Sequence, residues 1–282
     1  MSIIHDHTAC ELGEGPLWHP LRGELFWFDI EGKKLHSKSK SWDFEHYVSA
    51  AGWIDHDTLL IADAVSLFRF DIASATQTHV VDLEANNPIT RSNDGRADPW
   101  GGFWIGTMGI NKEPGAGAIY RYYHGELRQL YSAITIPNAI CFTPDQRFGF
   151  YTDTVNPVIW RQPLNPLNGW PDGKPEIFID LTGAGINPDG AVIDADGYFW
   201  NAQWGAGRLA RYAPNGSFVS QILLPTDHVT CPAFGGKNLQ TIFVTSATQN
   251  LSMLQRDAGK TFALPTEISG QAEHQLCGVG GS

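Results

Sequence analysis

The stretch Gly23-Glu24-Leu25-Phe26-Trp27-Phe28-Asp29 decides the fold class of this 282-residue chain. A turn residue opens it, and a run of large apolar residues then ends in a small or polar one, here Asp29. The same pattern returns in residues 57–63, 102–107, 147–153, 197–202 and 240–246. Because aromatic and aliphatic runs bounded by turn residues are typical of buried strands, the sequence predicts one such strand in each of six repeats.

Each copy has similar neighbours on both sides. A second strand-like run follows it, often with an arginine, as in residues 67–70, 119–122, 159–161 and 209–212. A third apolar run comes next, and a fourth precedes each copy, as in residues 137–142. Four short strands repeating every ~40–50 residues are typical of a propeller blade. We therefore expect an all-β, six-bladed β-propeller over residues 1–282 as one domain, with residues 2–9 supplying the last strand of the C-terminal blade.

The composition excludes several function classes. A formal net charge of -11 disfavours binding to nucleic acid or to an anionic membrane. The N-terminus lacks a signal peptide, and no apolar stretch is long enough to span a bilayer, so we expect a cytoplasmic protein. The four widely spaced cysteines indicate reduced thiols packed in a core. An acidic surface is compatible with a monomer or a dimer.

Candidate functional residues lie just before the innermost strands, where a propeller brings distant segments to one central space. Glu14, Asn138 and Asp189 offer two carboxylates and one amide carbonyl at corresponding places in three repeats. Such oxygen donors suit Ca²⁺, Mg²⁺, Mn²⁺ or Fe²⁺. Each tripeptide alone is also an ordinary turn sequence, and only their common position in the repeat favours a site.

Several motifs together resemble the SMP-30/gluconolactonase/regucalcin family. They are Gly13-Glu14-Gly15-Pro16, Arg91-Ser92-Asn93-Asp94-Gly95, Gly106-Thr107-Met108, Pro137-Asn138, Pro188-Asp189-Gly190 and Asp194-Ala195-Asp196-Gly197. The resemblance implies a six-bladed propeller with one catalytic divalent cation (Ca²⁺, Mg²⁺, Mn²⁺, Fe²⁺ or Zn²⁺). It places the metal ligands at Glu14, Asn138 and Asp189 and the substrate contacts at Arg91 and Asn93.

One loop departs from the family pattern and leaves the particular sugar open. Some members carry an acid a few residues after the Gly-Thr-Met motif, where this chain has Asn111, with Glu113 nearby. We expect Asn111 to contact the substrate. Gluconate, xylonate, arabinonate and galactonate lactones all remain candidates.

The implied activity is hydrolysis of a sugar lactone to the sugar acid. A bound cation polarises the lactone carbonyl and lowers the pKa of its water toward about 7. We expect Asp189 to be both a metal ligand and the acceptor of the water proton, and Arg91 to hold hydroxyls or the developing oxyanion.

Two other readings use the same scaffold. One is a hydrolase of organophosphates or other esters, and the other is a non-enzymatic propeller that binds calcium or another ligand. The chain lacks the Gly-x-Ser-x-Gly, phosphate-loop and His-Glu-x-x-His signatures of other enzyme classes. Trp18, Trp53 and Trp204 lie near strand ends, where they either pack the blades or wall a sugar pocket.

Overall fold

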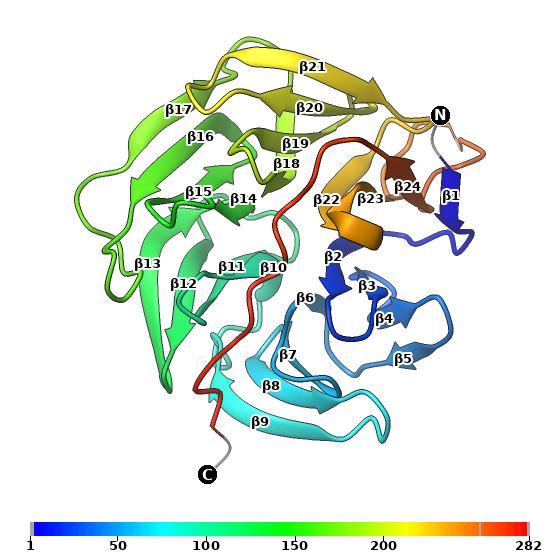
Figure 1. The fold of residues 1–282 in the computed structure, drawn as a ribbon. Coiled ribbons are helices and arrows are strands. Elements are labelled where there is room, and N and C mark those ends of the chain that lie inside the picture. Colours follow the sequence, from blue (N-terminus) through cyan, green and yellow to red (C-terminus); the bar gives the residue numbers. More distant parts are fainter. Residues whose placement is uncertain (1–2, 254, 281–282) are drawn as a thin grey trace.

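Each repeat of the sequence folds into one four-stranded antiparallel sheet, and the six sheets form a ring (Figure 1). This computed structural model describes residues 3–253 and 255–280. The six-bladed β-propeller predicted from the sequence is therefore confirmed.

The blades follow one another in chain order, each from its innermost to its outermost strand. The first contains β2 (Gly13–His19), β3 (Glu24–Asp29), β4 (Lys34–Ser37) and β5 (Ser41–Asp43). The second contains β6 (Val48–Trp53), β7 (Thr58–Asp63), β8 (Ser66–Asp71) and β9 (Gln77–Asp82). The third contains β10 (Thr90–Ala97), β11 (Phe103–Gly109), β12 (Gly117–Tyr123) and β13 (Glu126–Ile134).

The remaining blades repeat this order. The fourth contains β14 (Pro137–Phe142), β15 (Phe148–Asp153), β16 (Asn156–Pro163) and β17 (Glu176–Asp180). The fifth contains β18 (Asn187–Ile193), β19 (Phe199–Trp204), β20 (Arg208–Tyr212) and β21 (Phe218–Leu223). The sixth contains β22 (Val229–Gly235), β23 (Thr241–Ser246), β24 (Thr261–Pro265) and β1 (Ile3–Asp6).

The sixth blade closes the ring with a strand from the other end of the chain. Strand β1 pairs antiparallel with β24, so the expected closing strand is confirmed for Ile3–Asp6. Ser2, the first residue of the expected strand, lies outside the described residues. A strand contributed across the chain ends covers an edge that would otherwise expose unpaired amide and carbonyl groups.

The apolar runs of the sequence are the second strands of the blades, buried on both faces. Strand β11 is buried along its whole length, and β3, β7 and β15 are buried except at their first residue. The outermost strands β9 and β21 are mostly exposed. The core therefore lies between adjacent blades, which explains why these strands read as continuous apolar runs.

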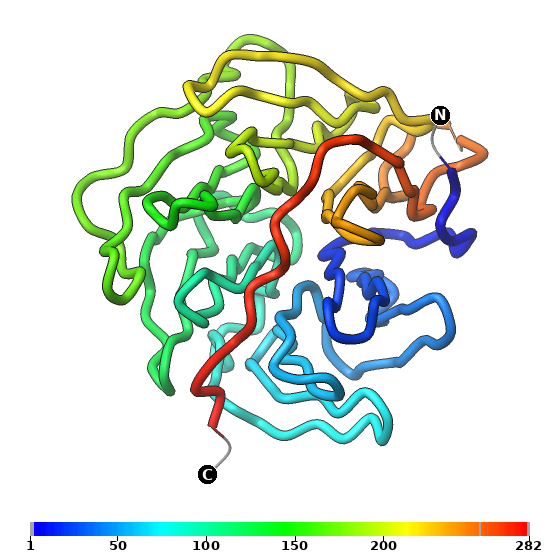
Figure 2. Tube along the Cα trace, viewed as in Figure 1, coloured from blue at the N-terminus to red at the C-terminus, as the bar shows by residue number. Residues whose placement is uncertain are grey.

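The C-terminal tail, residues 266–280, crosses the middle of the ring (Figures 1 and 2). Its Gln271 side chain donates to the carbonyls of Phe142 (3.1 Å) and Ile193 (3.0 Å), the last residues of β14 and β18. Its Leu276 amide donates to the carbonyl of Trp53, the last residue of β6 (2.9 Å). The tail thus covers the ends of three inner strands on one face, which leaves the starts of those strands for the opposite face.

Helices contribute almost nothing to the part of the chain that the structure describes. It contains one short 3-10 element, η1 (Lys237–Leu239), and no helix there has the length and apolar character needed to cross a bilayer.

Three of the four cysteines, Cys10, Cys141 and Cys231, are buried free thiols, as expected. The prediction of core packing is wrong for Cys277, which is exposed because it lies on the tail.

Candidate active site

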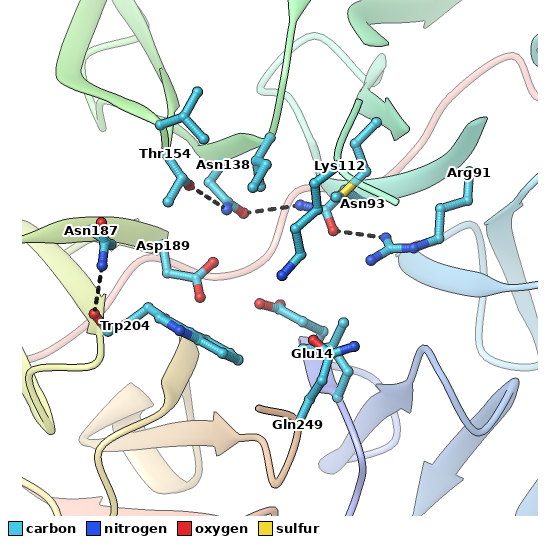
Figure 3. Close-up of a pocket in the computed structure, with 14 residues that line it drawn as sticks. Glu14, Arg91, Asn93, Lys112, Asn138, Thr154, Asn187, Asp189, Trp204 and Gln249 are labelled. Atoms are coloured by element: carbon cyan, nitrogen blue, oxygen red, sulfur yellow. Dashed lines mark hydrogen bonds between the residues drawn. The ribbon is translucent and has the colours of Figure 1, made fainter. Parts of the chain in front are cut away.

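A cavity of about 240 Å³ opens where the inner strands begin, on the face away from the tail. Five of the predicted site residues line it: Glu14, Arg91, Asn93, Asn138 and Asp189. They come from four of the six blades and converge on one space (Figure 3). The structure therefore brings together residues separated by up to a hundred and seventy-five positions in the sequence.

A β-bulge at the start of each inner strand aims these side chains. The register slips between Glu14 and Leu17 in β2 and between Asn138 and Cys141 in β14. Glu14 and Asn138 are the last paired residues before their bulges, whereas Asp189 lies within the bulge of β18. A bulge redirects a side chain that would otherwise follow the strict alternation of a strand. The expectation of equivalent positions is thus correct for Glu14 and Asn138, and Asp189 is displaced by one residue.

The residues after Glu14 and Asn138 adopt left-handed backbone conformations, Gly15 with φ 52° and Ala139 with φ 61°. Gly15 also has no room for a side chain, because an added Cβ would lie 2.2 Å from the Ser49 carbonyl oxygen. Ala139 carries a Cβ in this region, at a cost of about 1–2 kcal/mol. Such strain at a site wall is typical of functional positions.

Two buried carboxyl groups, those of Glu14 and Asp189, line the cavity, and a third, that of Asp94, lies near Glu14. Glu14, Asp94 and Asp189 are only 6%, 5% and 7% exposed. Burial raises the pKa of Glu14, and the Asp94 carboxylate raises it further. Burial likewise raises the pKa of Asp189, with a further contribution from Glu14, and raises that of Asp94 to about 6.

These carboxyl groups lack paired side-chain cations. Within residues 3–253 and 255–280, neither Glu14, Asp94 nor Asp189 forms a salt bridge. A buried carboxylate without a partner costs free energy unless a cation or a proton neutralises it. Two carboxylates and an amide oxygen on one wall are a donor set that suits a hard divalent cation. The residues therefore fit the cation that the sequence resemblance implies.

A chain of hydrogen bonds joins the predicted substrate residues to one predicted metal ligand, Asn138. The Arg91 Nη1 donates to Asn93 Oδ1 (3.0 Å), and Asn93 Nδ2 donates to Asn138 Oδ1 (3.3 Å) (Figure 3). Asn93 Nδ2 also donates to the Pro137 carbonyl (2.9 Å). Asn138 Nδ2 then donates to Thr154 Oγ1 (2.9 Å). These contacts fix the orientation of both side-chain amides, because in each one the oxygen accepts a hydrogen bond and the NH₂ group donates one.

The loop after the Gly-Thr-Met motif places Lys112, rather than Asn111, at the cavity. Asn111 is exposed, and its Nδ2 donates to the Glu113 carboxylate (3.1 Å). Lys112, with φ 61°, lines the cavity and points its amine toward the space above Glu14 (Figure 3). The structure separates Asn111 from the other predicted site residues.

Trp204 and Gln249 complete the rim. Trp204 lines the cavity and stacks on His228 with ring centroids 4.0 Å apart, so it walls the site. Gln249 Nε2 donates to Glu31 (3.1 Å), whose carboxylate also lies 3.9 Å from Arg91. Glu31 therefore interacts with two residues that line the cavity, Gln249 and Arg91.

The other two tryptophans pack the blades instead. Trp18 stacks on Phe243 with ring centroids 5.5 Å apart, and Trp53 donates to the Glu273 carbonyl (2.9 Å).

A second group of possible metal donors, Cys10, Asp29 and His36, is buried beside the first blade. The Asp29 carboxylate already accepts three backbone amides at 3.0–3.1 Å. Asp63 and Asp153 bind backbone amides in the same way at the corresponding ends of β7 and β15. This recurrence indicates that Asp29 stabilises a loop rather than holding an ion.

Several residues at or beside the cavity were not predicted as site residues, among them Asp94, Lys112 and Thr154. Asp94 stood inside a quoted motif, but its buried position beside Glu14 depends on the bulge of β10. Lys112 and Thr154 follow strands of the third and fourth blades and carry no periodic signal of their own. Thr154 directly follows β15, whereas Lys112 is the third residue after β11, so the repeat gave no common position for them.

Comparison with known proteins now identifies the family. Residues 12–248 match the family described as SMP-30/Gluconolactonase/LRE-like region, and the chain belongs to it. A putative sugar lactone lactonase of Rhizobium meliloti (strain 1021) is 40% identical over 276 residues, covering 94% of each chain. An L-arabinolactonase of Azospirillum brasilense is 34% identical, covering 96% of this chain and 94% of the relative.

The fold comparison agrees with the sequence comparison. A crystal structure described as a calcium-binding protein, regucalcin, from Agrobacterium tumefaciens strain C58 superposes with a TM-score of 0.95 at 38% identity. The match covers 98% of this chain and 97% of that one.

Proposed function

We propose that this chain hydrolyses a sugar (aldono)lactone to its sugar acid, with one divalent cation held by Glu14, Asn138 and Asp189. The observation that carries the proposal is the group of buried carboxyl groups without paired cations, beside an oriented amide oxygen, at one cavity wall. The names of the relatives, a sugar lactone lactonase and an L-arabinolactonase, support the choice of reaction.

The cation would polarise the lactone carbonyl and lower the pKa of its bound water. Asp189 accepts a proton from the attacking water as the water oxygen bonds to the carbonyl carbon. The ring C–O bond then breaks, and the former ring oxygen takes up a proton. Water is consumed and the open-chain sugar acid is the product, so no other reactant is needed.

The remaining polar side chains of the wall bind the substrate. Arg91 is buried and held by Asn93, so its position is set before the substrate arrives. Lys112 supplies a second cationic donor from the same blade, in the loop after β11 (Figure 3). Trp204 offers an apolar face to the sugar ring, while Asn93 presents its amide to the same space. Such a site suits a neutral, hydroxyl-rich molecule that becomes anionic on hydrolysis.

The test is cation-dependent lactone hydrolysis by Asp189→Ala beside a matched control, Asp145→Ala. Asp145 is exposed in the turn between β14 and β15, away from the cavity, so its loss should leave the rate of hydrolysis unchanged. Asp189→Ala should remain folded and lose cation-dependent turnover. Full activity in Asp189→Ala would rule out its two proposed roles.

A further inference from the structure

Thr154 lies between two of the proposed cation ligands without being one itself. It follows β15 and lines the cavity beside Asn138 (Figure 3). Its hydroxyl accepts from Asn138 Nδ2 (2.9 Å) and donates to the Pro188 carbonyl (2.8 Å). Pro188 immediately precedes Asp189 in β18. One hydroxyl therefore connects the fourth blade to the fifth at the point where each supplies a ligand.

The number of protons on this hydroxyl determines its role. A threonine hydroxyl has one proton to donate, and a backbone carbonyl can only accept. Because that proton is committed to the Pro188 carbonyl, Thr154 can only accept from Asn138. The group of Asn138 that faces Thr154 must then be the NH₂ group, which turns the Asn138 carbonyl oxygen away, toward Asn93.

The contact on the other side of Asn138 is consistent with this orientation. Asn93 Nδ2 reaches Asn138 Oδ1 at 3.3 Å but shares its donor capacity with the Pro137 carbonyl at 2.9 Å. The bond from Asn138 to Thr154 is shorter and is the contact that holds the NH₂ end of the amide. If the side-chain amide of Asn138 were rotated by half a turn, its NH₂ group would take the place of its oxygen. It would then present two hydrogens to the cation site and could not bind a cation.

We propose that Thr154 is a positioning residue that makes Asn138 a cation ligand and fixes the backbone next to Asp189. This inference rests on the proposed cation site. Residues that orient metal ligands typically change metal affinity by about 10–100-fold when they are removed. Thr154 acts through hydrogen bonds to the ligands and does not contact the cation.

The test is the dissociation constant of metal-stripped protein for Ca²⁺ and for Mn²⁺, measured by titration calorimetry. Thr154→Val keeps the side-chain shape, removes the hydroxyl and should weaken binding about 10-fold or more. Thr154→Ser keeps the hydroxyl and should restore affinity. Thr152→Val is the matched control, since the Thr152 hydroxyl on the same strand donates to the Val158 carbonyl (2.8 Å) and not to the site.

A double-mutant comparison separates orientation from general stabilisation of the blades. Both carboxylate oxygens of an Asn138→Asp variant are acceptors, so this side chain has no wrong orientation. Adding Thr154→Val to Asn138→Asp should cost much less cation affinity than adding it to the native chain. Thermal unfolding in the presence of a chelator shows whether each variant is folded. If Thr154→Val does not fold, the cation affinities of Thr154→Ser and Thr154→Ala are compared instead.

Three results would overturn the inference: native affinity in folded Thr154→Val, an equal loss in Thr154→Ser, or an equal cost of Thr154→Val in both backgrounds. Absence of cation binding by the native chain would overturn it as well. Lactone hydrolysis is measured separately, so that failure of this inference can be told from failure of the proposed reaction. If the native chain hydrolyses the lactone but binds no cation, the reaction stands and Thr154 has no role as a positioning residue.

Discussion

The side-chain amide of Asn93, on β10, donates to the side-chain oxygen of Asn138, on β14, and so joins two blades at the cavity wall. The same Asn93 accepts from Arg91 (3.0 Å). Its replacement by alanine should therefore release both Arg91 and Asn138. We expect Asn93→Ala to lower kcat/KM for the lactone by about 10–100-fold and to weaken cation binding.

Steady-state kinetics and calorimetry measure the two effects of Asn93→Ala, with Asn215→Ala as the control. Asn215 is exposed in a turn of the fifth blade, where its side chain accepts one backbone amide. A variant with native KM, kcat and cation affinity would show that the link between the blades has no functional role.

Lys112 should contribute to substrate binding rather than to cation binding. Removing its amine in Lys112→Met should raise KM several-fold and leave the cation affinity undiminished, because a positive charge near the site repels a cation. Lys112→Arg should retain part of the effect. Lys237→Met, at an exposed position in η1, is the control. A native KM in Lys112→Met would place the lysine outside the substrate site.

The three buried carboxyl groups of the site should destabilise the metal-free protein increasingly as pH rises through the acidic range. Glu14, Asp94 and Asp189 have pKa values raised by burial, that of Asp94 to about 6. The folded state then holds more protons than the unfolded chain, so the unfolding free energy decreases from about pH 4 upward. A bound cation favours the ionised carboxylates and should reduce this slope.

Urea unfolding at several pH values, in chelator and in excess Ca²⁺, measures the difference. At a cation concentration one hundred times the dissociation constant, the added stability is about 2.7 kcal/mol. Asp189→Asn should lose most of the Ca²⁺-dependent increment. Identical pH profiles with and without Ca²⁺ would argue against a cation at these carboxylates.

The C-terminal tail should contribute substantially to stability through Glu273. Glu273 forms a buried ion pair with Arg96, whose Nη2 also donates to the carbonyls of Ala191 and Pro232. Removing one partner of a buried pair leaves an uncompensated charge and costs about 3–5 kcal/mol. Glu273→Gln should therefore lower the unfolding free energy by this order.

Two variants check the assignment of that loss. Glu126→Gln breaks an exposed pair with Arg128 and should cost no more than about 1 kcal/mol. Replacing both partners, as in Arg96→Met with Glu273→Leu, should cost less than Glu273→Gln alone. A loss in Glu273→Gln no larger than in Glu126→Gln would contradict the importance of the buried pair.

The repeat predicted the fold because each blade must bury its second strand on both faces. Runs such as residues 23–29 and 102–107 therefore retain their apolar character in every copy. The course of the tail could not be predicted, because residues 266–280 have no periodicity and are held by backbone carbonyls of distant strands. The exposure of Cys277 follows from that course and was missed with it.

The candidate site was predictable where a motif marks the start of an inner strand, as for Glu14, Asn138 and Asp189. It was not predictable where the local backbone decides which neighbour faces the cavity. Lys112 and Asn111 are both exposed, but only Lys112 lines the cavity, whereas Asn111 bonds Glu113. Thr154 depends on a hydrogen bond to the next blade, which no spacing within the sequence reveals.

The central proposal, a cation-dependent lactonase, is tested most directly by pH-indicator hydrolysis of a panel of aldonolactones with metal-stripped protein. Ca²⁺, Mg²⁺, Mn²⁺, Fe²⁺ and Zn²⁺ are added separately, and each rate is compared with a protein-free blank, since lactones also hydrolyse spontaneously. The account predicts turnover of at least one lactone that is lost on stripping and restored by one of these cations. No acceleration of any lactone by folded protein with any cation would contradict it.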